Sequence, residues 1–200
     1  MKERFRSLSL IFIGQILCGI GIGFFLYANL GSDAASVLMD GISYSLDISF
    51  GTAAALLNII ILVIVFFIDK SYIHIASLTA IFINGYVADL TAALLNALPL
   101  ADGLILRVVF MLIGLILLAI GVAIYVRANL GVGAVDLLAE IISDRSNLRY
   151  GLVRNGTDFL FIILGGLLGG TIGLGTIVSV LLLGQLIDIV RRRLELALSK

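Results

Sequence analysis

The chain has little of the chemistry on which most enzyme sites depend. Its 200 residues include one cysteine, one proline and one histidine. Because Cys18 stands alone, no disulfide or thiolate metal cluster can form within the chain. A single histidine also excludes a His-Glu-x-x-His zinc motif, and the sequence contains no phosphate-binding P-loop and no Gly-x-Ser-x-Gly elbow. We therefore expect no enzymatic activity, no cofactor and no metal site.

Charge is also scarce, and apolar residues dominate. The 13 basic and 13 acidic side chains balance to a formal charge of zero, so the chain has no basic footprint for nucleic acid. By contrast, 61% of the residues are hydrophobic and the mean hydropathy is +1.21. This composition indicates a chain embedded in a membrane.

Six long apolar runs are each near the roughly 20 residues that cross a hydrocarbon core of about 30 Å. A secretory signal peptide would have a shorter apolar stretch followed by a cleavage site. The only proline, Pro99, lies in a short link between the third and fourth runs, where it can end a helix without breaking one. The runs cover residues 8–29, 52–69, 75–98, 104–127, 152–170 and 172–190.

The chain is an internal duplication. The sequence Ala-Asn-Leu-Gly at residues 28–31 recurs at 128–131, and 15 of the 41 positions from 11 to 51 are identical one hundred residues later. After a gap of one residue, Gly85 and Asp89 align with Gly184 and Asp188. Apolar composition alone would not place Gly, Asn and Asp in register. We therefore expect one membrane domain built of two repeats, residues 1–100 and 101–200.

A shorter segment, residues 33–47 and 133–147, follows the first run of each half. Its polar residues fall on one helical stripe, spaced by three or four positions. A helix of 14 residues is only about 21 Å long, too short for the bilayer. The pattern predicts a non-spanning helix, and whether that helix is re-entrant or interfacial stays open.

The basic residues favour six spans over eight. Six spans place twelve Lys and Arg on or near the cytoplasmic side and only Arg107 outside, whereas eight spans give eleven and two. Three spans per half is an odd number, so the second half would insert upside down relative to the first. The expected fold is all-α and polytopic, with six transmembrane helices, two short helices and a 3+3 inverted repeat. Both termini would be cytoplasmic.

Several motifs of the second half resemble a known group of proteins. These are Leu-Gly at 130–131 with Asp136 and Leu138, Tyr-Gly-Leu-Val-Arg at 150–154 with Asp158, and the glycine-rich run 168–176. The chain resembles the bacterial YczE/YyaS/YitT group of small integral membrane proteins. In the first half, Ala34 and Ser36 stand where that group has Pro and Asp. The resemblance implies a bacterial inner membrane and a small polytopic architecture, and no substrate.

Ionisable groups within the predicted spans are the first site candidates, because each needs a partner or a wet cavity inside a membrane. Arg154 and Asp158 are four residues apart and can pair on one helix face. Asn58 is the repeat mate of Asp158, so both halves place a polar group at matched depth. The alternative is a structural pair that anchors the helix end.

The short helices supply further candidates. Asp40 and Glu140 are repeat mates, as are Ser36 and Asp136. If the two stripes approach each other across the pseudo-two-fold axis, they would line a cavity for a cation, a proton or an amine-bearing solute. The alternative is that each stripe faces water at the membrane surface.

The repeated Asn-Leu-Gly sequences predict helix breaks at Asn29 and Gly31 and at Asn129 and Gly131. A glycine in the left-handed region would end one helix and let the next begin at an angle. Exposed backbone donors at the start of the next helix could also hold an anion, and a purely structural turn is the alternative.

These observations predict a small transporter or permease of unknown substrate, with a polar cavity between the repeats and coupling to protons or cations as one option. Its partners would be the lipid bilayer and a small solute or ion. Small-residue stripes such as Gly19-x-x-x-Gly23 suit packing within the chain or a homodimer. Two other classes stay open: a substrate-binding membrane subunit of a multi-component importer, and a non-transporting accessory or regulatory membrane protein.

Overall fold

The computed structural model describes residues 2–98, 103–128 and 131–198. These ranges are helical apart from short links, as predicted, and they hold no strand. Each half has the same order of elements: a long helix, a short helix and two further long helices. The first half contains α1 (Lys2–Ala28), α2 (Ala34–Leu46), α3 (Phe50–Asp69), a single 3-10 turn (Lys70–Tyr72) and α4 (Ile75–Ala97). The second contains α5 (Leu104–Val126), α6 (Ala134–Ser146), α7 (Tyr150–Leu167) and α8 (Leu174–Leu198).

Five helices in the described residues are long and apolar enough to cross a membrane: α1, α3, α4, α5 and α8. The chain is therefore a polytopic membrane protein. The sixth predicted span, α7, has 18 residues and is not among the five, because Arg154, Asn155 and Asp158 lower the hydropathy of its first half. The short helices α2 and α6 have 13 residues each, about 20 Å, and cannot span a bilayer as single helices.

The short helices end in the same way in both halves. Asp47 and Asn147 follow α2 and α6 with φ of 52° and 56°, in the left-handed region that short polar residues tolerate. One turn earlier, Ser43 and Ser143 donate hydrogen bonds to the carbonyls of Ile48 and Leu148, at 2.6 and 2.9 Å. These side chains bind carbonyls that follow the helix, so each helix stops sharply and the chain turns into the next span.

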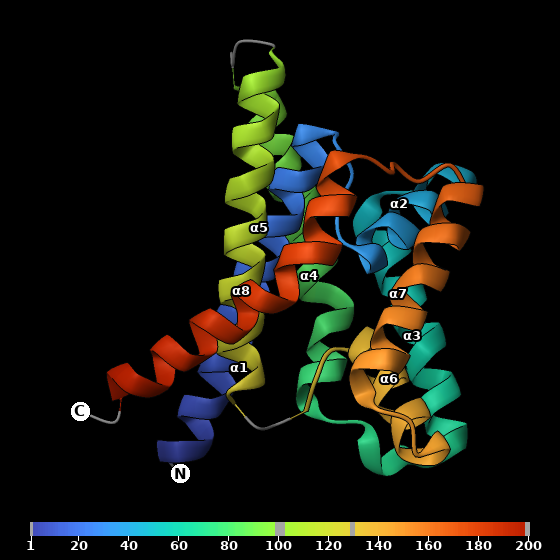
Figure 1. The fold of residues 1–200 in the computed structure, drawn as a ribbon, viewed down its shortest axis with the longest axis vertical. Coiled ribbons are helices and arrows are strands. Elements are labelled where there is room, and N and C mark those ends of the chain that lie inside the picture. Colours follow the sequence, from blue (N-terminus) through green and yellow to red (C-terminus); the bar gives the residue numbers. More distant parts are fainter. Residues whose placement is uncertain (1, 99–102, 129–130, 199–200) are drawn as a thin grey trace.

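The helices form two groups that draw on both halves (Figure 1). In what we call the first bundle, α1 packs against α4 and α5, and α5 packs against α8. In the second bundle, α2 packs against α3 and α7, and α6 packs against the same two helices. Exchanging each helix for its repeat mate therefore leaves the contacts within each bundle unchanged.

The centre of the first bundle is the crossing of α1 and α5. A Cβ on Gly14 would lie 2.7 Å from the carbonyl oxygen of Gly121, and a Cβ on Gly21 would lie 2.7 Å from that of Gly114. Such distances leave no room for a side chain, so the glycines permit this close approach. Because residue numbers rise along α1 as they fall along α5, the two repeat mates run antiparallel.

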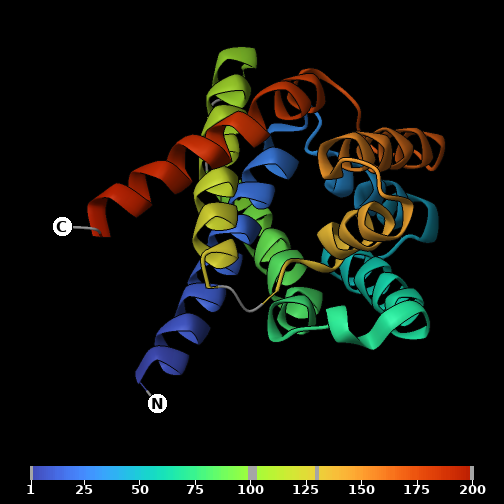
Figure 2. The same ribbon diagram turned by 60° about the horizontal axis from the view of Figure 1, so that its bottom comes forward.

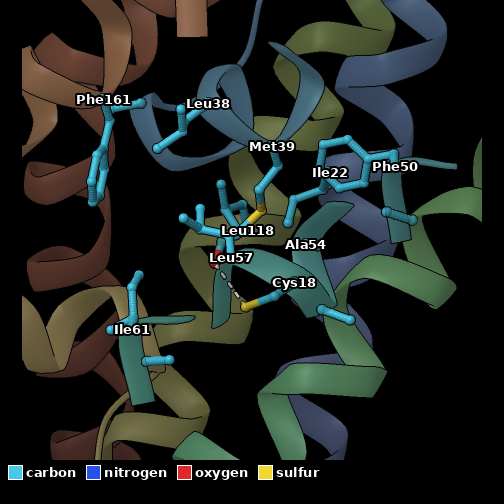
Figure 3. Packing of buried hydrophobic residues seen from close by; sticks show 14 of the residues in the cluster. Cys18, Ile22, Leu38, Met39, Phe50, Ala54, Leu57, Ile61, Leu118 and Phe161 are labelled. Carbon is cyan, nitrogen blue, oxygen red and sulfur yellow. Dashed lines mark hydrogen bonds between the residues drawn. The ribbon is translucent and has the colours of Figure 1, made fainter. Parts of the chain in front are cut away.

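At the middle of this crossing, Cys18 lies beside its own repeat mate, Leu118 (Figure 3). The Cys18 Sγ is 3.9 Å from the Leu118 carbonyl oxygen. Met39 of α2 and Leu57 of α3 belong to the same buried cluster, which joins the two bundles. The core of the molecule therefore sits where the repeats meet.

Candidate functional site

The Arg154 and Asp158 side chains of α7 form the predicted pair. The Nε of Arg154 donates to both carboxylate oxygens of Asp158, at 3.1 and 3.3 Å. Helical spacing of four residues places the two side chains on one face. The Thr157 hydroxyl donates to the backbone carbonyl of Arg154 at 2.8 Å, so this hydrogen bond does not involve the ion-paired side chains.

Arg154 also binds Asp136, in the first turn of α6. Its Nη1 forms an ion pair with one oxygen of Asp136, and the other oxygen accepts a hydrogen bond of 2.9 Å from the Tyr125 hydroxyl of α5. A carboxylate near a helix N-terminus is stabilised by the helix dipole. One guanidinium thus joins α6 to α7, and Tyr125 ties the cluster to the first bundle.

The cluster is neither sealed nor solvated on all sides. The side chains of Arg154, Asp136 and Asp158 retain 31%, 18% and 23% of their exposure. All three side chains are therefore only partly buried. The arginine is shared between acids from two helices.

Asp33 of the first half lies within electrostatic range of this cluster. Its carboxylate caps α2 and accepts hydrogen bonds from the Ser36 hydroxyl at 2.6 Å and from the Ser36 amide at 3.3 Å. Burial raises its pKa, the Ser36 hydrogen bonds oppose that rise, and the charges of Asp158 and Arg154 act in opposite directions. Two carboxylates, Asp136 and Asp158, share one guanidinium, which gives these three side chains an excess of one formal negative charge.

Asp33 and Tyr125 are absent from the candidates that the sequence suggests. Asp33 was visible on the polar stripe of α2, but its nearness to α7 depends on how the halves fold together. Tyr125 gives no signal in the sequence, since it is one aromatic residue within an apolar run.

Asp40 belongs to a different place. It accepts a hydrogen bond of 2.7 Å from the Thr171 amide, in the link between α7 and α8. Asn29 and Ser32 join these two residues around a small cavity of about 40 Å³. The structure thus separates Asp40 from the Arg154 cluster, and in the described residues α2 packs mainly against α3 and α7 rather than against α6.

The other candidates also lie apart from Arg154. Ser36 is buried and serves Asp33, while the Asn58 amide is 3.5 Å from the carbonyl oxygen of Ala80 on α4. Glu140 lies one turn beyond Asp136 and has no hydrogen bond or ion pair to Arg154 in the described part of the chain. Of the polar stripe on α6, only Asp136 therefore belongs to the Arg154 cluster.

The predicted helix breaks are present where the structure describes them. Asn29, Gly31 and Gly131 have φ of 51°, 86° and 95°, while Asn129 lies outside the described residues. The first break packs closely on the glycine-rich run 168–176, where the Gly175 amide, at the start of α8, donates to the Leu30 carbonyl at 2.7 Å. These backbone groups bind each other, which favours the structural interpretation of the turn.

Comparison with known proteins supports the resemblance. The family model described as a family of unknown function, DUF6198, matches residues 5–192. An uncharacterized protein of Haemophilus influenzae is 29% identical over 92% of this chain and 83% of its own length. The uncharacterized protein YyaS of Bacillus subtilis is 27% identical over 88% of each chain. The uncharacterized membrane protein YczE of the same organism is 32% identical over 74% of this chain and 69% of its own. No solved structure matches the chain.

Proposed function

Since the chain belongs to the DUF6198 family, whose function is unknown, we propose a function from its own geometry: a small membrane transporter of cationic solutes or protons. The observation that carries the proposal is the shared position of Arg154, held between Asp136 and Asp158 with Asp33 nearby. Placing an ionisable residue at the centre of a membrane helix costs about 2.5–3.5 kcal/mol. Ionisable residues in such helices are therefore candidates for a solute or ion pathway.

In the proposed mechanism, the incoming cation competes with Arg154 for the carboxylates. While the site is empty, the guanidinium neutralises Asp136 and Asp158. A bound cation would displace it from one of them, and a proton on a carboxyl group would weaken the same pair. Arg154 acts as a built-in counter-ion, and no chemical step on the solute is part of the proposal.

The architecture favours transport between two sides of a membrane. The antiparallel crossing of α1 and α5 supports an inverted-topology repeat, since mates in such a repeat run in opposite directions. The charge distribution supports six spans and cytoplasmic termini. The bacterial relatives support a bacterial inner membrane.

The test is flux into proteoliposomes, with a pH-sensitive dye for protons and tetraphenylphosphonium as an organic cation. We expect Asp136→Asn and Asp158→Asn to lower the flux at least tenfold. Glu140→Gln removes an acid from the same helix as Asp136 without touching Arg154, and it should transport like the wild type. A wild type that moves neither probe, or two Asn variants as active as the wild type, would remove these acids from any transport role.

A further inference from the structure

The two halves of the chain differ where the bundles meet. In the first half, α3 of the second bundle packs along α4 of the first. Their repeat mates, α7 and α8, do not pack in this way, and the two ribbons diverge from the link that joins them (Figures 1 and 2). Contacts within each bundle obey the repeat, so this difference is a break in the symmetry between bundles.

The α3–α4 contact is a close one at the start of α3. A Cβ on Gly85 would lie 2.8 Å from the Cα of Gly51, so the two backbones touch. The Gly51 amide donates a hydrogen bond of 2.9 Å to the Asp89 carboxylate. That acid therefore satisfies one of the free amides at the N-terminus of α3. We call Gly51, Gly85 and Asp89 the closed latch.

The second half carries the same three residues in register, Gly151, Gly184 and Asp188. Here a Cβ on Gly151 or on Gly184 would meet nothing within 4 Å. A glycine inside a helix costs roughly 1 kcal/mol relative to alanine. Gly184 therefore has no packing reason in this conformation, whereas a conformation that closes α7 on α8 would supply one. We call these residues the open latch.

We propose that the two latches exchange states, and that this exchange rocks the second bundle against the first. In the exchanged conformation, Gly51 would separate from Asp89 while Gly151 binds Asp188. The two halves would then have exchanged roles. The two conformations would exchange an α3–α4 contact for an α7–α8 contact, as an alternating cycle requires. This step rests on the proposed function, since it would turn the Arg154 cluster from one side of the membrane to the other.

Spin labels on exposed positions report each latch. Residues 52 and 82 follow the first latch, and their repeat mates 152 and 181 follow the second; all four side chains are exposed. In the full chain, with Cys18→Ala and reconstituted in lipid, we expect both pairs to show a short and a long distance. A single long distance for 152 and 181 across pH 5 to 8 would overturn the proposal.

A matched pair of glycine variants tests whether close packing at Gly151 produces the short distance between residues 152 and 181. Gly151→Val should hold the pair at 152 and 181 in its long population, because a side chain at the mate, Gly51, would lie 2.9 Å from the Tyr86 ring and 3.0 Å from the backbone carbonyl carbon of Gly85. The control is Gly156→Val on the same helix, which also has nothing within 4 Å but has Leu56 as its mate. It should keep both populations. Equal populations in the two variants would contradict the latch.

The distances are measured without any transported solute, so the two proposals fail separately. If both label pairs show two distances but the protein transports neither probe, the latch proposal stands and the proposal of a cation transporter is rejected. If flux depends on Asp158 but each label pair keeps a single distance, the transporter proposal stands and the latch proposal is rejected.

Discussion

A single guanidinium organises the polar interior of this protein. Arg154 binds one acid on its own helix and one on α6, and the second acid is held in turn by Tyr125 from α5. Each bond pairs a donor with an acceptor, and an unpaired polar group in an apolar environment would be costly. The cluster is thus a network, in which the loss of any member affects the others.

Tyr125→Phe tests the network at its edge. The variant keeps the buried ring but leaves one Asp136 oxygen without its 2.9 Å hydrogen bond. Hydrogen bonds to charged groups contribute about 1.5–3 kcal/mol, so the free energy of unfolding in detergent should fall by roughly that amount. Tyr27→Phe is the control, because its ring packs 5.0 Å from Phe110 and its hydroxyl has no hydrogen bond within the described residues. Equal stability of both variants would show that the Tyr125 hydroxyl is immaterial.

At the scale of elements, the crossing of α1 and α5 is a close helix contact within the first bundle. It depends on four glycines in reciprocal positions, Gly14 against Gly121 and Gly21 against Gly114. Gly14→Ala would place a Cβ 2.7 Å from a backbone oxygen and 2.8 Å from Tyr125, so the helices must separate. Overpacking of this kind costs about 1–3 kcal/mol.

Thermal unfolding in detergent measures that cost. Gly14→Ala should lower the midpoint by several degrees. Gly156→Ala adds the same methyl group to a helix where it meets nothing within 4 Å, and its higher helix propensity should leave the midpoint unchanged or raised. A midpoint for Gly14→Ala at or above that of the wild type would contradict the tight crossing.

Elements were more predictable than the site. Helix bounds follow from apolar length and breaking residues, so α2 and α6 begin and end within one residue of the predicted segments. The pair of Arg154 with Asp158 follows from helical spacing alone. The partnership of Arg154 with Asp136, and the separation of Asp40 from both, depend on which helices pack together, and a single sequence carries no such information.

At the scale of the whole molecule, the number of crossings decides which side each short helix ends on. With six spans, residue 46 at the end of α2 lies outside and residue 146 at the end of α6 lies inside. With eight spans, both lie inside. The side of residue 46 therefore separates the two topologies.

Labelling with a membrane-impermeant maleimide in intact cells reads this directly. In a Cys18→Ala background we expect Leu46→Cys to react and Ser146→Cys to react only after the cells are opened. Both positions are exposed in the structure, so a lack of reaction is not a matter of burial. Protection of Leu46→Cys in intact cells would favour eight spans.

The α1–α5 crossing has the reciprocity of an isologous dimer interface: where residue 14 of one helix meets 121, residue 114 of the other meets 21. Two separate copies of one half could make this contact only if the membrane held them in opposite orientations in equal numbers. Fusion into one chain removes that requirement. The basic residues of each half are then free to fix one orientation each, instead of being balanced so that a single sequence inserts both ways.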